Sequence, residues 1–129
     1  MKIIISALLL AITLGCSTSA RQTQNKIYDK EFRTVFQASL SALKDRRFTI
    51  KSYDWNSGEI DSYKKSKEGE KNKEVRATVS LEQINQKTKV RINVQQSEES
   101  TLIAQSEIEL IEREFFVSLD NAINNIPRN

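Results

Sequence analysis

Residues 75–94 read VRATVSLEQINQKTKVRINV, and their pattern determines the architecture of the chain. Apolar and polar residues alternate through both halves of this stretch, which is typical of two strands that each bury one face. A tight turn at Asn85-Gln86, or equally a four-residue loop from Ile84 to Lys87, gives one antiparallel register. On one face, apolar residues then pair with each other: Leu81 with Val90, Val79 with Ile92, and Ala77 with Val94. On the other face, the opposite charges of Glu82 and Lys89 pair. We therefore predict a hairpin with one buried face and one open face.

A second hairpin is expected just upstream. Residues 48–53 alternate as a strand does, and a shorter strand follows from Glu59 to about Lys65. Asn56-Ser57-Gly58 supplies a three-residue turn with glycine where a positive φ is needed. The next stretch, Lys64 to Glu74 (KKSKEGEKNKE), carries both signs of charge. We interpret it as a solvated hairpin loop. Phosphate binding is the alternative, but the carboxylates cancel most of the positive field.

Two amphipathic helices flank the strands. Asp29 can cap a first helix that runs to about Arg46, and Pro127 stops a second one. Both helices show the i, i+3, i+4 spacing of a single apolar stripe. The first stripe is Phe32, Val35, Phe36, Ser39, Leu40 and Leu43; the second is Ile108, Ile111, Phe115, Leu119, Ile123 and Ile126, widened by Phe116 and Ala122.

These elements predict an α+β fold in two layers. Each helix has one apolar stripe, and each strand of the 75–94 hairpin has one apolar face. The economical arrangement is a four-stranded antiparallel meander with the N-terminal and the C-terminal helix on one face, in the order αββββα. The opposite face meets water or a partner through polar side chains: Arg76, Thr78, Ser80, Glu82, Lys89, Arg91, Asn93 and Gln95.

The N-terminus has the pattern of a targeting segment. Met1-Lys2 precedes an apolar run from Ile3 to Leu14. As a helix this run is roughly 18 Å long, which is shorter than the ~30 Å hydrocarbon core of a bilayer. We interpret it as the central part of a signal peptide. The run ends at Gly15-Cys16, and the chain of 129 residues contains one cysteine.

This ending resembles the lipobox of bacterial lipoprotein precursors, in which a small residue precedes the modified cysteine. The resemblance implies diacylglycerol on the Cys16 thiol, cleavage before Cys16 and usually acylation of the new amine. Each buried acyl CH₂ contributes about 0.8 kcal/mol, so two or three chains give a stable anchor. Ser17 is not the aspartate that retains lipoproteins in the inner membrane of many enteric bacteria, which implies the periplasmic face of the outer membrane. The alternatives are an ordinary secretory peptide with an incidental cysteine, or a buried apolar helix.

The chain is accordingly divided into three parts. Residues 1–15 are the lipoprotein signal peptide, residues 16–27 a lipidated flexible tether, and residues 28–129 a single α+β domain. The order of elements behind the cysteine also resembles small envelope lipoprotein domains of the BamC type, from the outer-membrane β-barrel assembly machinery. This second resemblance covers about residues 28–126 and is one of pattern, without an invariant motif.

Composition argues against several classes of function. Histidine is absent, which excludes His general bases, Cys-His nucleophiles and Cys/His zinc sites. The carboxylate pairs Glu107/Glu109 and Glu112/Glu114 point apart at i, i+2 spacing, which favours a solvated helix face over a shared acid-base site. We therefore predict no enzyme, no cofactor and no metal site. A net charge of +3 is too small for a typical nucleic-acid-binding protein, so no nucleic acid is expected as a partner.

Three aromatic residues are the candidate partner-contact site. With the three-residue turn, Trp55 lies opposite Glu59 and Tyr53 lies opposite Asp61, while Tyr63 lies opposite Lys51. Tyr53, Trp55 and Tyr63 then share the open face of the sheet, and exposed aromatic residues flanked by charges are typical of a protein contact. The alternative is that a bulge reverses the parity, or that the rings cover lysine stems at the sheet edge.

The leading hypothesis is a lipid-anchored, non-catalytic accessory or assembly module of the bacterial envelope that presents its open sheet face to a protein partner. A second hypothesis is a carrier or sensor of a small apolar or lipidic ligand held between helices and sheet. Its pocket would be lined by four phenylalanines: Phe32, Phe36, Phe115 and Phe116. Their helical spacing is also typical of residues that pack in a hydrophobic core. An envelope enzyme that uses Ser, Lys or carboxylates is the least favoured class.

Overall fold

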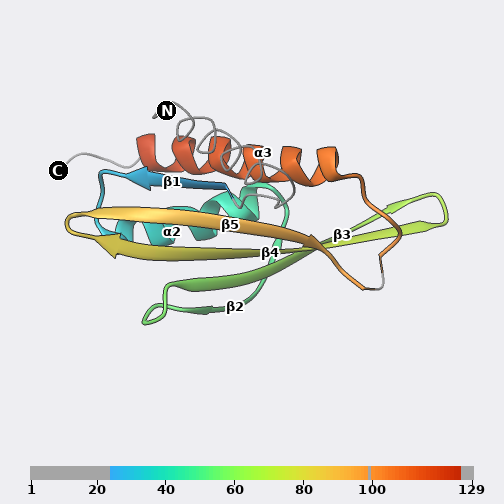
Figure 1. Ribbon diagram of the computed structural model, residues 1–129, viewed down its shortest axis with the longest axis horizontal. Coiled ribbons are helices and arrows are strands. Elements are labelled where there is room, and N and C mark those ends of the chain that lie inside the picture. The colour runs from blue at the N-terminus through green and yellow to red at the C-terminus, as the bar shows by residue number, and fades with distance from the viewer. Residues whose placement is uncertain (1–23, 99, 126–129) are drawn as a thin grey trace, which may run out of the picture.

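The computed structural model describes residues 24–98 and 100–125 as one antiparallel sheet with two helices (Figure 1). In chain order the elements are β1 (Gln24–Tyr28), α2 (Phe32–Asp45), β2 (Thr49–Asp54), β3 (Glu59–Glu68), β4 (Lys71–Ile84), β5 (Lys87–Gln96) and α3 (Gln105–Asn124). The strand order in the sheet is β1-β5-β4-β3-β2. The α+β class is therefore confirmed. No helix in the described ranges is long and apolar enough to cross a membrane.

The β4–β5 hairpin has the register that its sequence predicts. Leu81 pairs with Val90, Val79 with Ile92, Ala77 with Val94 and Glu82 with Lys89. Ile84 pairs with Lys87, so the turn is the tight one at Asn85-Gln86, and Asn85 adopts a positive φ of 57°. Asparagine tolerates this conformation better than most residues because its short polar side chain bonds locally.

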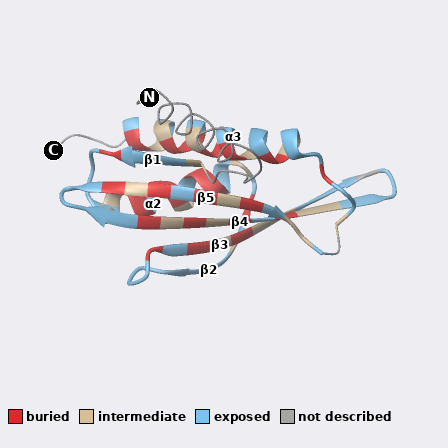
Figure 2. Cartoon of the chain, viewed as in Figure 1, coloured by how far each residue is buried: buried red, intermediate tan, exposed pale blue. Residues whose placement is uncertain are grey.

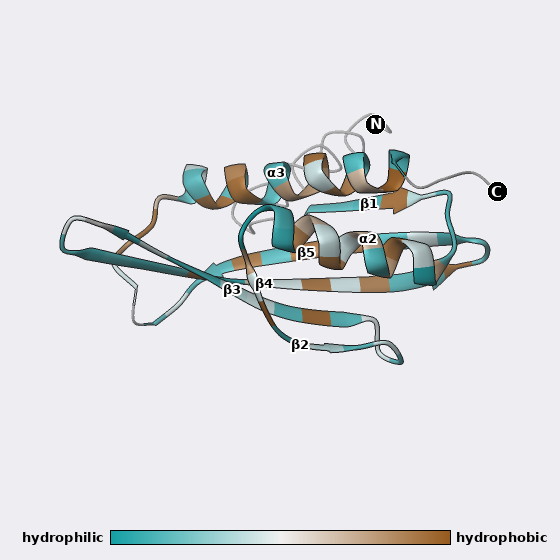
Figure 3. Cartoon of the chain, turned by 180° about the vertical axis from the view of Figure 1, so that it is seen from behind, coloured by the Kyte–Doolittle hydropathy of each residue, from teal (hydrophilic) through white to brown (hydrophobic). Residues whose placement is uncertain are grey.

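Both helices cover the same face of the sheet, as predicted. Helix α2 contacts β2, β4 and β5, helix α3 contacts β5, and the two helices contact each other. Figure 2 shows the buried residues of β4, β5 and the helices gathered between the layers, and Figure 3 shows apolar segments on the helix side. The core includes the predicted stripes apart from Ile126, which lies outside the described residues; Phe36 and Phe115 are essentially inaccessible, and Phe32 and Phe116 pack at its margin. Helix α2 begins later than expected, with Glu31 rather than Asp29 at its N-cap.

A fifth strand, β1, corrects the predicted tether and the predicted start of the domain. Residues 24–27, assigned above to the tether, pair with β5 from Gln24↔Ile92 to Tyr28↔Thr88. Only Tyr28 of this strand is buried, so the segment carries almost no hydrophobic periodicity by which to recognise it. Its stabilisation comes from backbone pairing with β5 and from contacts to α3. The ordered domain therefore begins no later than residue 24, and the remaining tether, 16–23, lies outside the described residues.

The charged stretch 64–74 is strand rather than loop. Strands β3 and β4 stay paired from Glu59↔Ser80 out to Glu68↔Lys71, so only residues 69 and 70 form the turn. The tip of this hairpin projects past the helices (Figure 1). We call residues 64–74 the arm. The free edge of β4 in the arm is covered by the segment after β5: Ser97 N donates to Glu74 O at 2.9 Å, and Thr101 N to Asn72 O at 3.0 Å. Backbone hydrogen bonds thus hold an extended conformation that the charged sequence does not reveal.

The β2–β3 hairpin departs from its predicted register by one residue at its tip. Asp54 pairs with Glu59 and Tyr53 with Ile60, so the connection has four residues, 55–58, instead of three. A bulge between Ile50 and Ser52 then shifts the pairing again, and Thr49 lies opposite Tyr63. A bulge inserts one residue and reverses the side-chain parity on the bulged strand. The face predicted for Tyr53, after the bulge, is therefore wrong, whereas Ile50, before the bulge, packs against the core as its alternation with Phe48 predicts.

Candidate functional site

Cys16, the predicted lipidation site, lies outside the described residues, as does the whole predicted signal peptide.

Tyr53 and Trp55 lie on the helix side of the sheet and not on the open face. The ring of Trp55 stacks on that of Phe36 in α2, with centroids 4.1 Å apart, and the ring of Tyr53 meets Phe36 edge-on at 6.1 Å. Tyr53 pairs with Ile60, whose side chain is fully buried against the helices. The prediction that these two aromatic residues share the open face is wrong, because the four-residue turn reverses their direction. Both rings cover the outer margin of the core.

Tyr63 does lie on the open face, where it pairs with Arg76. The Nζ atom of Lys65 lies 5.7 Å from the centre of its ring, a cation–π contact. The fold thus separates the three predicted contact residues, with one on the open face and two on the helix face. No alternation pattern in the sequence distinguishes a three-residue turn from a four-residue one, so the sequence could not have settled this point.

The open face carries its acidic residues near the β2–β3 turn. Asp54, Glu59 and Asp61 line a hollow of about 360 Å³ together with hydroxyl groups of Ser52, Ser57 and Thr78. Arg76 reaches Asp61 across the strands, with Nη2 at 3.2 Å from Oδ2. The two other carboxylates, which are exposed, have no ion pair among the described residues. The hollow is therefore negatively charged.

The basic residues of the same face follow β5. Lys87, Lys89 and Arg91 alternate along this strand on the side away from the helices. The register places Arg91 opposite Ser80, and Ser80 in turn opposite Glu59, so acid and base lie in one row across three strands. The open face is thus acidic at the β2–β3 turn and basic along β5, and β4 between them carries both signs in Arg76 and Glu82. Sequence reasoning missed this division because it depends on the β2–β3 register.

Glu112 of α3 is not solvated as predicted. It is buried, and its Oε2 accepts a hydrogen bond from the backbone N–H of Val94 at 3.3 Å. This hydrogen bond links α3 to the backbone of β5, two residues beyond the pair Gln24↔Ile92. The role of Glu112 is structural, and the helical spacing rule assigned it to the wrong face because the residue lies beside the apolar stripe.

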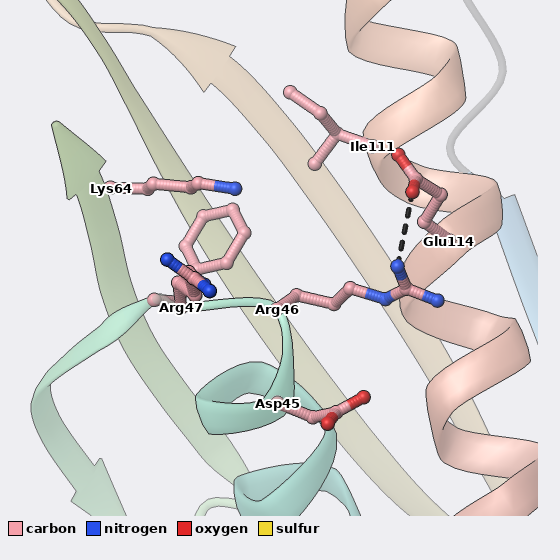
Figure 4. A pocket seen from close by; sticks show the side chains of 7 residues that line it. Asp45, Arg46, Arg47, Lys64, Ile111 and Glu114 are labelled. Carbon is pink, nitrogen blue, oxygen red and sulfur yellow. Dashed lines mark hydrogen bonds and ion pairs between the residues drawn. The ribbon is translucent and has the colours of Figure 1, made fainter. Parts of the chain in front are cut away.

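A second polar cluster surrounds the C-terminus of α2 (Figure 4). Arg46 Nη1 donates to Glu114 Oε2 at 3.0 Å, and Arg46 Nε donates to Ser118 Oγ at 2.7 Å. Ser118 Oγ in turn donates to Asp45 Oδ2 at 2.8 Å. This network joins α2 to α3 and forms one wall of a hollow of about 160 Å³. Lys64 of β3 forms part of the opposite wall, since Figure 4 shows it reaching toward the space between Arg47 and Ile111.

Arg47 lies at the mouth of this hollow in an unusual backbone conformation. Its φ is +66°, in the left-handed region, and it ends α2 with a Schellman motif. Arg47 N donates to Lys44 O and Phe48 N donates to Leu43 O, both at 2.9 Å. Glycine is the residue that this position usually holds, because any side chain there is strained. A pair of arginines directly after an apolar helical stripe is a sequence signal that could have drawn attention to the site.

The chemistry available in the domain is that of charge recognition. No three acidic residues, cysteines or histidines of the described ranges come together in a way that could hold a metal ion. What the two clusters offer is carboxylates for a cationic group on the open face, and guanidinium and ammonium groups for an anionic one on the helix side.

Comparison with known proteins reveals the fold and nothing finer. No family model matches the sequence, and no curated protein matches it closely. Among solved structures, Ara h 8.0201 is similar with a TM-score of 0.59 at 10% identity, over 81% of this chain and 97% of that one. The vertebrate conserved region of human METTL16 is similar with a TM-score of 0.51 at 9% identity, over 95% of this chain and 92% of that one. At such low identity these likenesses show a shared arrangement of helices and strands.

Proposed function

We propose that this protein is a lipid-anchored lipoprotein of the bacterial envelope whose domain is a non-catalytic interaction module. The observation that carries the proposal is the bare, charge-divided face of the sheet, away from both helices. A protein surface that is polar, uncovered and split by sign suits recognition of a partner with the complementary charge pattern.

The anchor is supported by the sequence at Gly15-Cys16 and by the chain length that follows. From residue 16 to residue 24 the backbone makes eight Cα steps. Fully extended, these span at most about 29 Å. A lipid on Cys16 would therefore keep the domain within roughly one domain diameter of the bilayer, because residues 24–27 belong to β1 and do not lengthen the connection.

The acidic hollow suggests which kind of group the partner presents. Asp54 and Glu59 lie side by side at the end of β2 and the start of β3, and both are exposed. Lysine or arginine side chains of a partner would find there two carboxylates together with hydroxyl acceptors. We expect such contacts to set the association rate and the choice of partner more than the affinity.

Site-specific crosslinking in intact cells tests this proposal. A photoreactive amino acid at Thr78, in the middle of the open face, should crosslink one specific envelope protein. The same amino acid at Arg113, exposed on α3, is the matched control and should not. The proposal fails if Thr78 yields no product in repeated experiments, or if both positions yield the same products.

Charge substitutions refine the test. Replacing Asp54 with Asn and Glu59 with Gln removes two negative charges from the hollow without changing side-chain size, and should reduce the crosslinked product severalfold. Replacing Glu109 with Gln on the exposed side of α3 is the control and should leave the yield unchanged. An unchanged yield in the double variant would remove the acidic hollow from the contact surface.

A further inference from the structure

The hollow beside the α2 C-terminus has the chemistry of a binding site for a small amphiphilic anion. We propose that it binds a medium-chain monocarboxylate, with the carboxylate between Arg47 and Lys64 and the apolar chain directed along α3. This inference goes beyond the proposed function and does not depend on Cys16 being lipidated.

Two cations at the hollow are available to a ligand. The carboxylates that line it are already engaged, Glu114 by Arg46 and Asp45 by the hydroxyl of Ser118. The side chains of Arg47 and Lys64 make no ion pair and no hydrogen bond with other described residues. The Lys64 ammonium lies over the ring of Phe48, 5.7 Å from its centre. A bound carboxylate could therefore pair with this guanidinium and this ammonium without displacing another carboxylate from either of them.

The position of Lys64 is itself unusual. It pairs with Val75, whose side chain is buried, so Lys64 occupies the face of β3 that otherwise belongs to the core. A cation on this face costs desolvation unless an anion accompanies it. An inward-pointing charge can also protect a sheet edge from pairing with another chain. The effect of Lys64→Gln on ligand affinity, described below, distinguishes that role from ligand binding.

The backbone of Arg47 supports the same assignment. An L residue in the left-handed conformation is less stable there than glycine, so the fold retains a guanidinium at a position where it is unfavourable. Ligand binding by the Arg47 side chain, which lines the hollow, would explain why the fold tolerates this loss of stability. Figure 4 shows Arg47 and Lys64 on the same side of the hollow, across from Glu114.

The apolar part of the ligand has a surface to lie on. Phe48 and Ile111 line the hollow of about 160 Å³, and a neighbouring hollow of about 210 Å³ shares Lys64, Ile111 and Glu114 with it. Val75, Ile103 and Leu110 add apolar surface to the second hollow. A chain of several methylene groups can therefore run from the two cations along the first turns of α3. A doubly charged phosphate fits less well than a carboxylate, because Asp45 and Glu114 stand nearby and repel the second charge.

Titration of the full chain with octanoate tests the site. The full chain is kept free of bilayer, and the methyl resonances of Ile103 and Ile111 are followed by NMR. Octanoate should shift both in a saturable manner, while 1-octanol, which has the chain without the charge, and acetate, which has the charge without the chain, should bind at least about tenfold more weakly. A wild-type protein without saturable shifts, or one that binds 1-octanol as tightly as octanoate, would overturn the proposal.

The substitution Arg47→Gly separates binding from folding. It relieves the strained backbone, so the melting temperature should rise, and it removes the guanidinium, so octanoate affinity should fall about tenfold or more. Lys64→Gln should lower affinity to a similar extent. Lys67→Gln removes the same charge from the arm outside both hollows and is the matched control, with unchanged affinity expected. If Arg47→Gly and Lys64→Gln bind octanoate as the wild type does, the assignment of these two residues is wrong.

Discussion

Gly58 shows how one residue fixes the β2–β3 turn. Its φ is +75°, and a Cβ atom placed on it would collide with the backbone carbonyl oxygen of Leu81. Its own carbonyl accepts a hydrogen bond of 2.7 Å from the N–H of Leu81. The turn therefore lies directly against β4, and the sequence correctly marked this glycine as necessary while misjudging the length of the turn around it.

Replacing Gly58 with alanine should be severely destabilising, and Gly69 provides the matched control. Gly69, at the tip of the arm, has a similar φ of +63° but open space around it. Gly69→Ala should lower the free energy of unfolding by about 1–2 kcal/mol, from backbone strain alone. Gly58→Ala should lower it by about 3 kcal/mol or more, because the clash also breaks the hydrogen bond to Leu81. Urea unfolding of both variants measures the difference. Equal costs would show that the contact with Leu81 is absent.

Tyr28 is the residue whose ionisation the fold opposes most clearly. Burial, and next the hydrogen bond of 2.7 Å to Asp120 and its negative charge, raise the pKa of the Tyr28 hydroxyl above its usual value of 10.0. Above about pH 10 the unfolded chain loses a proton that the folded protein keeps, so the free energy of unfolding should fall as the pH rises through that range.

Absorbance titration checks this prediction, since the chain has three tyrosines. Tyr28 should ionise only as the protein unfolds, so the wild type should show an absorbance step at unfolding that Tyr28→Phe lacks. The pH dependence of the free energy of unfolding above pH 10 should also be weaker in Tyr28→Phe. Ionisation of Tyr28 in the folded wild type would contradict the assigned contact.

At the scale of the element, the β4–β5 hairpin was predictable and its neighbours were not. A one-residue slip in that hairpin would expose its entire apolar set, so hydrophobic burial alone fixes the pairing of Val79 with Ile92. Strand β2 has no such constraint because almost all of its side chains are exposed. Its bulge and its turn depend on contacts such as Trp55 on Phe36, which link distant parts of the sequence.

Strand β1 and the arm were missed for a related reason. Both are held by backbone hydrogen bonds and single polar contacts, which leave no periodicity in the sequence. The same holds for the charge-divided face and for the hollow near Arg47. Each forms only when the strand register and the position of α3 are known.

The attachment of β1 to α3 yields an element-scale prediction. The carboxylate of Asp120 accepts a hydrogen bond from the Tyr28 hydroxyl and forms an ion pair with the Lys26 ammonium at 2.9 Å. Asp120→Ala should lower the free energy of unfolding by about 1.5–3 kcal/mol. Most of this loss should come from the hydrogen bond to Tyr28, because the ion pair with Lys26 is exposed. Hydrogen exchange should then accelerate at the amides of β1 and remain slow in β4. Unchanged protection of β1 would show that backbone pairing with β5 suffices to hold the strand.

At the scale of the whole molecule, the sheet is one-sided: the helices bury one face, and the other face is acidic at the β2–β3 turn and basic along β5. At most about 29 Å of chain connects β1 to Cys16, the proposed site of the lipid anchor. With that anchor, the local concentration of the domain near membrane-bound partners would be set by the short connection rather than by its own affinity.

The most direct test of this account is the intact mass of the protein purified from bacterial membranes. We predict a chain that begins at Cys16 and carries the mass of a diacylglycerol, with or without a further acyl group on its amine, and we predict that Cys16→Ser abolishes this species. A membrane-derived chain whose Cys16 is unmodified would contradict the central claim.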